Sequence, residues 1–476
     1  MSMPLWRWSA ADLAKAIREK KVSSREVVQA HLARIEAVNP KVNAVTVVLA
    51  EEALRAAEAA DAQLAVGEEV GPLHGVPITV KEDTDLVGSA TTHGIVGLKE
   101  SMPERDAPVI AHLKQAGAIP IGRTNLPDSG LRWHTDNDLR GATLNPWNPA
   151  VTPGGSSGGG AAAIATGMSP LGVGNDMGGS LRYPALCCGI TAIKPGLGRV
   201  SRICSEIFPD PPLFYEQVAC VNGPMARHVA DLRLALEVMS RPDPRDPWWT
   251  PAPTLGSAMP RPIKVALTTD PAGQGGSPHV AAAVAKAAEI LAAAGYLIEA
   301  ADPPAIVESD ETIQQIADME VQSYLPGILP MMSEGGRTFL QGVMGVTKPD
   351  VETYIKAIGV RHRMARDWNL FFERTPLVLG PVSTLQAFQV GDDLAGPDAV
   401  RRFIRSIALT EICNLLGLPS LALPVEVSDG LPQGVQLIAP RFHEDLCFDA
   451  AAVIEGAQGV FTPIEPREER GAVRPH

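Results

Sequence analysis

Three short segments of the sequence carry residue types that together could perform acyl transfer. In the first, the apolar run 75–80 (Gly-Val-Pro-Ile-Thr-Val) ends at Lys81, which is followed by Glu82 and Asp83. Lysine is rarely buried without a partner, so Lys81 is either paired with one of these acids or kept as a base. Burial disfavours the charged form of a lysine, and only the neutral amine accepts a proton. Both interpretations stay open from this segment alone.

The second segment, residues 153–160, reads Pro-Gly-Gly-Ser-Ser-Gly-Gly-Gly and contains Ser156 and Ser157. Ser156 matches the G-x-S-x-G motif that carries the nucleophile of α/β-hydrolases. That motif follows a buried strand, whereas residues 145–153 contain three prolines, which a central strand does not tolerate. A Walker-type phosphate loop needs a lysine after the glycines, and none follows. A glycine-rich turn that opens a helix stays as the purely structural alternative.

The third segment, residues 174–182, places two glycines directly before Ser180 and ends at Arg182. Glycines let a carbonyl group approach the backbone, so several N–H groups could converge on an oxyanion. The residues expected to provide this oxyanion hole are Met177, Gly178 and Gly179. Asp176 and Arg182 flank them, and we expect these two to form an ion pair. Each segment is weak evidence alone, but the three supply different parts of one catalytic site.

The surrounding elements predict an α/β protein. Ser23 and Glu26 form a capping box that predicts the start of a helix. Two short β-branched runs, 74–80 and 118–122, flank a predicted helix at 107–115, which indicates a βαβ unit in a parallel or mixed sheet. Residues 141–200 combine many glycines with six prolines and are expected to form irregular backbone around a site. We expect a single domain over residues 1–476, with a helical lobe inside residues 243–375.

Composition excludes several classes of function. Of the 476 residues, 45% are apolar, enough to bury a large core, and the net charge of −13 opposes binding to nucleic acid or anionic membranes. There is no apolar run of 18 residues and no signal peptide, so we expect a cytoplasmic protein without a membrane span. The six cysteines lack a C-x-x-C pair and are expected to be reduced. We expect no metal and no other cofactor.

Taken together, the three segments resemble the amidase signature family. The matching residues are 75–81, 154–159 and 176–182, with further matches at 189–195, 417–424 and 434–439. Ser156 and Ser180 are 24 residues apart, as in that family, and the resemblance covers nearly the whole chain. The sequence departs from the family at Asn175, where Thr or Ser is usual, and in the segment from Thr124 to Asp128, which lacks the common Glu. We expect both departures to affect substrate preference more than the chemistry.

The resemblance implies a fold and a mechanism. The fold is a central mixed β-sheet covered by helices on both faces. The mechanism is a Ser-cisSer-Lys triad, in which Ser180 is the nucleophile, Ser156 follows a cis peptide bond and relays the proton, and neutral Lys81 is the base. The residues expected to support the triad are Ser157, Asp176 and Arg182. The resemblance to the family implies small amides as substrates, and the similarity of the whole sequence to the metagenomic urethanases of the family implies carbamates as the alternative.

Two alternatives remain from the sequence. The glutaminase subunit of a tRNA-dependent amidotransferase has the same triad but needs partner subunits. A silent binding protein is a third hypothesis, opposed by the presence of all three triad residues at the family's spacing. For the substrate pocket we predict walls from 202–217 and 382–393, including Phe208, Phe214 and Phe388, with surface loops as the alternative. We expect a monomer or a homodimer.

Overall fold

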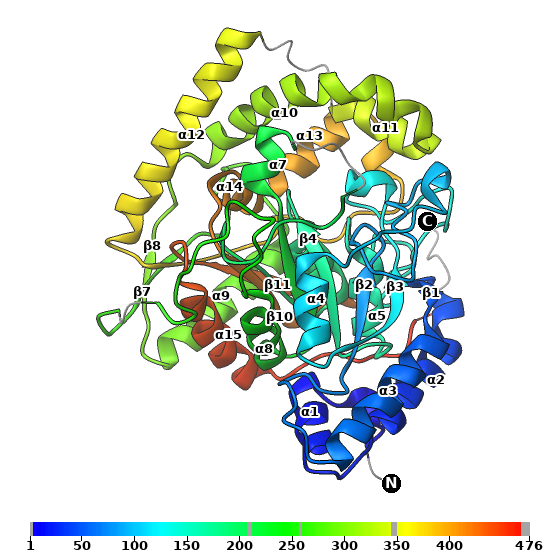
Figure 1. Cartoon of the computed structure of the whole chain (residues 1–476). Helices are drawn as coiled ribbons and strands as arrows, with labels where there is room; N and C mark the ends of the chain where they lie inside the picture. The colour runs from blue at the N-terminus through cyan, green and yellow to red at the C-terminus, as the bar shows by residue number, and fades with distance from the viewer. Residues whose placement is uncertain (1–2, 207–211, 257–258, 344–349, 468–476) are drawn as a thin grey trace, which may run out of the picture.

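The computed structural model describes residues 3–206, 212–256, 259–343 and 350–467 (Figure 1). Its described strands form one sheet of 11 strands in the order β1-β3-β2-β4-β6-β5-β10-β11-β9-β7-β8. The strands are β1 (Val45–Val48), β2 (Pro77–Lys81), β3 (Ile119–Thr124), β4 (Leu171–Asp176), β5 (Thr191–Lys194), β6 (Val221–Ala226), β7 (Lys264–Leu267), β8 (Leu297–Ala300), β9 (Leu377–Gly380), β10 (Ser420–Ser428) and β11 (Leu431–Ile438). The sheet is mixed, because β2 runs parallel to β3 and β4 while β4 is antiparallel to β6.

Helices cover both faces of this sheet, as the resemblance implies. The α-helices are α1 (Ala10–Arg18), α2 (Ser24–Val42), α3 (Ala50–Ala65), α4 (Pro108–Gln115), α5 (Gly158–Ala165), α6 (Arg182–Cys188), α7 (Phe214–Ala219), α8 (Val229–Met239), α9 (Pro278–Ala293), α10 (Ile306–Ile328), α11 (Glu334–Val343), α12 (Val351–Phe372), α13 (Pro397–Ser406), α14 (Ala408–Leu416) and α15 (Glu444–Gln458). Short 3₁₀ helices are η1 (Leu5–Arg7), η2 (Val96–Leu98), η3 (Asp128–Gly130), η4 (Leu329–Met331) and η5 (Asp392–Leu394). The capping box at Ser23 and the helix at α4 confirm the local predictions.

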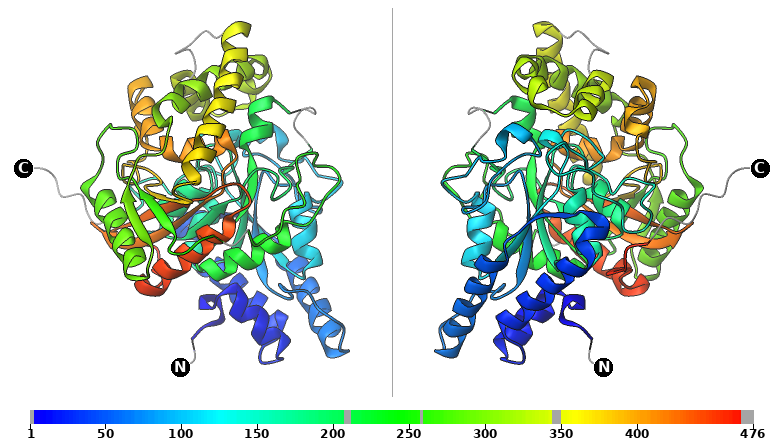
Figure 2. Two further views of the ribbon diagram at one scale, coloured as in Figure 1. Left: turned by 90° about the vertical axis from the view of Figure 1, so that its left-hand side faces the viewer. Right: turned by 90° about the vertical axis from the view of Figure 1, so that its right-hand side faces the viewer.

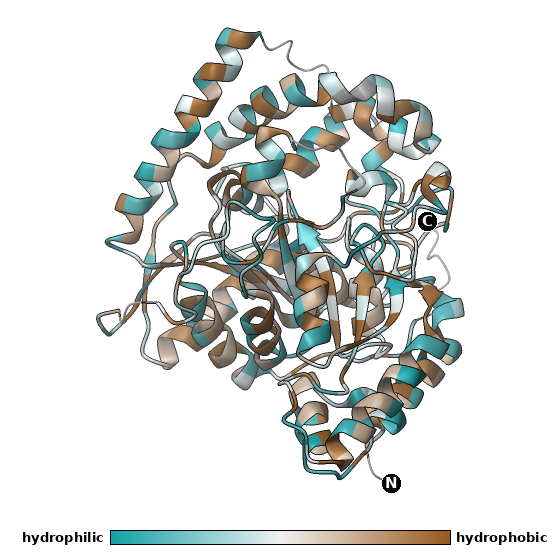
Figure 3. Ribbon diagram, in the orientation of Figure 1, coloured by the Kyte–Doolittle hydropathy of each residue, from teal (hydrophilic) through white to brown (hydrophobic). Residues whose placement is uncertain are grey.

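The core lies on both sides of the sheet, because successive strand residues point to opposite faces. On β10, Leu421 and Leu423 belong to one apolar cluster, while Ala422 between them belongs to another. On β11, Leu437 and Ile438 are divided in the same way. The central strands are therefore apolar on both faces, whereas helices at the periphery such as α2 and α12 alternate polar and apolar residues (Figure 3).

The helical lobe is shorter than expected. Residues 264–300 add β7, α9 and β8 to the main sheet, so the mainly helical segment begins at Ile306 and ends at Phe372. Its helices lie at one end of the molecule, and the N-terminal helices α1 to α3 lie at the opposite end (Figures 1 and 2). No helix within the described ranges is long and apolar enough to cross a membrane.

The sheet topology brings two of the three motifs together. Strands β2 and β4 are parallel neighbours, with Val80 paired to Val173. Their C-terminal ends therefore reach the same edge of the sheet, where β2 ends at Lys81 and β4 ends at Asp176. The serine-rich motif lies directly before α5, which packs on β4. A single edge of the sheet thus receives the basic residue and both serine segments.

Candidate active site

Lys81 lies at the end of β2 with its side chain 0% exposed. Its Nζ is 2.7 Å from Ser156 Oγ, 2.8 Å from Asn175 Oδ1 and 3.0 Å from Asp83 Oδ2. Glu82, which is buried, instead forms an ion pair with the half-buried Arg140. The two interpretations of Lys81 are therefore not exclusive, since the lysine contacts both an acid and the hydroxyl that it would serve as a base.

Ser156 and Ser157 lie just before α5, and the Gly155–Ser156 peptide is cis. The N–H of Ser157 donates to the carbonyl oxygen of Ser180 at 3.2 Å, which joins the second motif to the third. The Ser157 hydroxyl is buried against Gly174, where a Cβ would lie only 2.7 Å from Ser157 Oγ. Ser157 thus supports the site through its backbone and its packing.

Ser180 follows the turn after β4 and lines the same cavity as Ser156. Gly179 adopts φ +96°, and a Cβ there would lie 2.9 Å from the Thr410 methyl group, so this turn requires glycine. The N–H of Gly179 donates to Asp176 Oδ1 at 2.8 Å. This bond corrects the expectation for Gly179, which stabilises the turn instead of facing an oxyanion. Within the described residues, the N–H groups of Met177, Gly178 and Ser180 donate to no protein acceptor.

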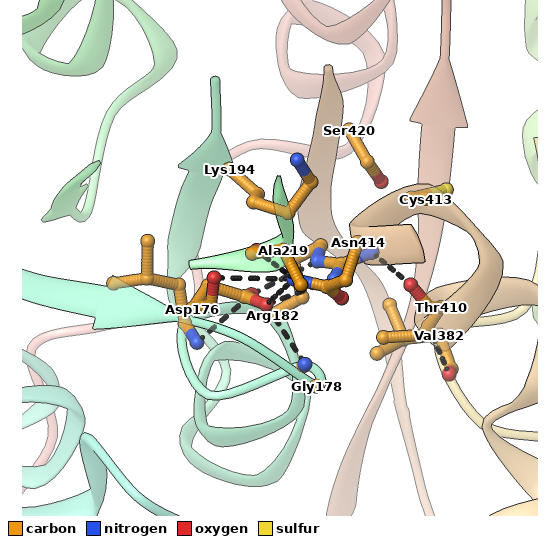
Figure 4. A network of polar contacts seen from close by, with 12 residues as sticks. Asp176, Gly178, Arg182, Lys194, Ala219, Val382, Thr410, Cys413, Asn414 and Ser420 are labelled. Atoms are coloured by element: carbon orange, nitrogen blue, oxygen red, sulfur yellow. Dashed lines mark hydrogen bonds and ion pairs between the residues drawn. The ribbon is translucent and has the colours of Figure 1, made fainter. Parts of the chain in front are cut away.

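A buried polar network lies behind this turn (Figure 4). Arg182 donates to both carboxylate oxygens of Asp176, from Nε at 3.0 Å and from Nη2 at 2.9 Å, as the sequence predicts. Asn414 of α14 donates to Asp176 Oδ1 at 2.9 Å and accepts from Arg182 Nη2 at 2.5 Å. Burial alone would raise the pKa of Asp176, but the charge and hydrogen bonds of Arg182 outweigh it and hold that pKa far below its ordinary value. The turn is therefore anchored to an ionised carboxylate.

A second buried lysine, Lys194 of β5, lies close to this network (Figure 4). Burial, with the charge of Arg182, lowers its pKa to about 8. Its Nζ donates to the carbonyl oxygen of Pro195 at 2.9 Å, whereas Lys81 Nζ lies 2.7 Å from Ser156 Oγ. Lys81 is therefore the lysine placed to act on the two serines.

The cavity in front of Ser156 and Ser180 has a volume of about 440 Å³. Most of its lining is apolar, and one wall comes from α10, η4 and α11. The wall residues from these helices are Ala317, Glu320, Val321, Gly327, Ile328, Met331 and Leu340. The hydroxyl of Ser333, just before α11, donates a hydrogen bond to the carboxylate of Asp128 in η3. This bond links the wall to the core. The segment from Thr124 to Asp128, which departs from the family pattern, therefore contributes the contact that attaches this wall to the core.

The structure places part of one of the two predicted pocket segments at this cavity. Residues 202–217 contribute Cys204, Leu213, Tyr215 and Glu216 to the lining, whereas residues 382–393 contribute none among those described. Phe208 lies outside the described residues. Neither Phe214 nor Phe388 lines the cavity, which corrects both predictions.

Both phenylalanines are used in packing elsewhere. The Phe388 ring stacks on Tyr183 at 6.0 Å between centroids and meets the Phe403 ring edge-on at 5.2 Å. Phe214 packs against the apolar cluster that contains Leu197 and Val218. Both side chains are half-buried, so much of their hydrophobic surface is already in contact with the protein.

The structure places two further side chains, Asn175 and His93, near Lys81. Asn175, for which the sequence predicts an effect on substrate preference, contacts the Lys81 amine directly. His93 also lines the cavity, and burial, followed by the opposing effects of Asp83 and Lys81, lowers its pKa to about 4, so its imidazole is neutral near pH 7. Among the described residues, no group of three His, Cys, Asp or Glu side chains could hold a metal ion, and all six cysteines are free thiols.

Comparison with known proteins assigns this geometry to a family. Residues 26–448 match the family model described as Amidase. The chain is 44% identical to the indoleacetamide hydrolase of Bradyrhizobium diazoefficiens over 460 residues, covering 96% of this chain and 88% of that protein. It is 33% identical to one subunit of the glutamyl-tRNA(Gln) amidotransferase of Moorella thermoacetica, covering 95% of this chain and 97% of that protein. A solved structure of 6-aminohexanoate cyclic dimer hydrolase is similar, with a TM-score of 0.82 and 30% identity. The match covers 98% of this chain and 99% of that chain.

Proposed function

The chain belongs to the amidase family, whose enzymes hydrolyse the C–N bond of amides, and from this premise we propose that it acts through a relay from Ser180 to Ser156 to Lys81. The observation that carries the proposal is the 2.7 Å contact between Lys81 Nζ and Ser156 Oγ, beside a cavity that Ser156 and Ser180 both line. A serine is a weak nucleophile at its free pKa and needs a base, and a buried amine serves when it is neutral.

Acylation begins when Ser180 Oγ attacks the amide carbonyl. Its proton passes to Ser156, whose own proton passes to Lys81. The oxyanion accepts hydrogen bonds from the N–H groups of Met177, Gly178 and Ser180, which donate to no described protein acceptor. The negative charge therefore develops against donors that the Asp176 network already holds in place.

The leaving nitrogen needs a proton, because an amine anion is too basic to depart. Ser156 supplies this proton and recovers one from Lys81. Water then attacks the acyl group on Ser180 by the same relay in reverse. With a carbamate the intermediate is an alkoxycarbonyl-serine, and its hydrolysis yields an alcohol and carbon dioxide beside the amine.

The cavity favours an uncharged, apolar acyl group, and we propose an arylacetamide-like primary amide as the preferred substrate. The indoleacetamide hydrolase relative supports this choice, as does the apolar lining. Glutamine would bring a free carboxylate, yet no arginine or lysine is among the described residues that line the cavity. Glu216 and Glu320 do line it, and burial raises the pKa of each. This lining opposes the glutaminase alternative.

The experiment is a substrate panel combined with covalent labelling. An arylacetamide, an anilide, an aryl carbamate and glutamine are compared by kcat/KM, and a sulfonyl fluoride adduct is located by mass spectrometry. We expect the arylacetamide to give the highest kcat/KM, glutamine to give none, and the adduct to lie on Ser180. An adduct on Ser156, or full activity in the Ser180→Ala variant, would refute the relay. A carbamate that exceeds the arylacetamide would reassign the substrate class while leaving the relay intact.

A further inference from the structure

We propose that Asp83 and Asn175 are positioning residues that aim the lone pair of the Lys81 amine at Ser156; this rests on the proposed function. The three side chains form a closed set of contacts. Lys81 Nζ lies 2.8 Å from Asn175 Oδ1 and 3.0 Å from Asp83 Oδ2, and Asn175 Nδ2 donates to the same Asp83 oxygen at 2.9 Å. All three are buried, so each contact is made in place of water.

The direction of the Lys81 lone pair follows from which neighbouring groups can donate a hydrogen bond. A neutral amine has two N–H donors and one lone pair, whereas an ionised carboxylate and an amide oxygen can only accept. Asp83 and Asn175 therefore take the two N–H groups of Lys81. Ser156 is the remaining neighbour and has a hydroxyl proton to give, so the lone pair is left facing Ser156 Oγ. Once the proton moves, the ammonium donates to all three oxygens without any rearrangement.

The orientation of the Asn175 amide is set by Asp83. If the amide were turned over, its NH₂ group would face the Lys81 amine and its oxygen would face the carboxylate, which loses both hydrogen bonds. A Thr or Ser hydroxyl at position 175 can donate or accept, so it would not fix the direction of the amine in this way. The departure of this sequence from its family thus has a specific effect on the base.

Asp83 also contributes charge. Burial would raise the pKa of Asp83, but the charges of Lys81 and His93 and the hydrogen bond from Asn175 outweigh it, so its pKa lies below the ordinary value. Asp83 is therefore an anion beside the ammonium that forms during catalysis. The other charged or titratable groups near Lys81 are His93, Glu82, Arg123, Cys204 and Cys220. Glu82 is paired with Arg140, and Arg123 donates to the Lys81 carbonyl oxygen, so Asp83 is the carboxylate in contact with the amine.

Two substitutions separate the effect of charge from the effect of geometry. Asp83→Asn keeps an acceptor but removes the charge that favours the ammonium, so the rising acid limb of kcat/KM should move to lower pH, by about one pH unit or more. Asn175→Leu keeps the size but removes the acceptor, so kcat should fall by about 10²-fold with a smaller change in that limb. Asn175→Thr should recover part of the loss. The matched control is Asp85→Asn, which removes a neighbouring buried carboxylate that contacts Ser205 and Glu206 and should leave the limb unmoved.

Each variant is measured with the full-length enzyme in two assays, amide hydrolysis and the rate at which a sulfonyl fluoride labels Ser180, both as functions of pH. Thermal unfolding identifies a variant that does not fold, in which case the other position decides. The positioning proposal is overturned if Asp83→Asn leaves the limb in place, or if Asn175→Leu keeps full kcat. The proposed function survives either result as long as the wild type is labelled on Ser180. A wild type that is not labelled there fails the proposed function itself.

Discussion

Asn414 is the side chain whose removal best tests the network behind the oxyanion turn. It lies on α14 with 0% exposure, 232 residues from Arg182 in sequence, yet it contacts both members of the Asp176–Arg182 pair. Asn414→Ala removes these contacts and leaves the ion pair in place. We expect a loss of both stability and kcat, because the same side chain also holds the backbone of the turn through the carbonyl oxygen of Asp176 at 3.1 Å.

The expected losses of stability and of kcat follow from the hydrogen bonds of Asn414. Asn414 Nδ2 has two hydrogens for three acceptors, which are Oδ1 and the carbonyl oxygen of Asp176 and the carbonyl oxygen of Ala219, so about two bonds form at a time. Its Oδ1 accepts one charge-assisted bond from Arg182. With one neutral bond at about 1 kcal/mol and two bonds to charged groups at about 1.5–3 kcal/mol each, the free energy of unfolding should fall by about 4–7 kcal/mol. Removing one oxyanion donor outright costs about 10²–10³ in kcat, so a loosened turn should cost about 10-fold or more.

The assay compares Asn414→Ala with a matched control, Asn39→Ala. Asn39 makes three hydrogen bonds to backbone groups at α2 and β1, on the edge of the sheet away from the turn. Chemical denaturation gives stability, and steady-state kinetics on an amide gives kcat and KM. We expect both variants to lose stability, Asn414→Ala more, and only Asn414→Ala to lose kcat, with little change in KM. Equal kcat in the two variants would refute the role of Asn414 in holding the turn.

Three further predictions test the proposed base, the lining of the cavity and the pH dependence of stability. Lys81→Arg should lower kcat/KM for amides by about 10³-fold or more, because guanidinium stays protonated and cannot accept a proton; near-full activity would exclude a neutral base. Leu213→Trp should lower kcat/KM more for bulky than for small acyl groups, whereas Phe388→Ala should leave that ranking unchanged. Burial lowers the pKa of His31 to about 4, below 6.5 for a free histidine, so the unfolded state binds more protons between these values. The free energy of unfolding should therefore fall by about 3 kcal/mol as pH drops from 6.5 to 4, and His31→Gln should reduce that slope in denaturation experiments.

The residues of the proposed relay could be predicted from the sequence because each belongs to a short contiguous motif. Some partners lie in the same motif, as Asp83 does beside Lys81, but the partners that come from distant segments could not be predicted. Asn414 gives only a weak signal, a polar residue three positions before the Gly417 that ends α14. The sequence marks Asn175 as unusual for the family, but it does not give the direction of the side chain. Neighbouring residues on a strand point to opposite faces, which turns Asn175 toward Lys81 and Asp176 toward Arg182.

The mixed sheet and its early βαβ unit follow from hydrophobic patterns, whereas the pocket does not. Aromatic residues in segments outside the catalytic motifs suggest the walls, but aromatic rings are equally suited to packing against one another, as Phe388 does with Tyr183 and Phe403. The wall instead comes from α10 to α11, a stretch predicted to be helical with no motif that links it to the site. That link depends on long-range packing and on the Asp128–Ser333 contact, which local spacing does not encode.

The wall formed by α10, η4 and α11 is one uninterrupted stretch, residues 306–343, and it contains none of the residues of the proposed relay. One wall of the cavity and the proposed relay are therefore encoded by separate stretches of the gene, although Leu213 and other lining residues lie outside residues 306–343. Exchange of this stretch between relatives is expected to change which acyl group fits while the chemistry is passed on unaltered. The condition for a working chimera is that the donor stretch keeps a serine able to meet Asp128, as Ser333 does here. Recombination at the ends of residues 306–343 is therefore expected to change the substrate preference of such an enzyme in one step.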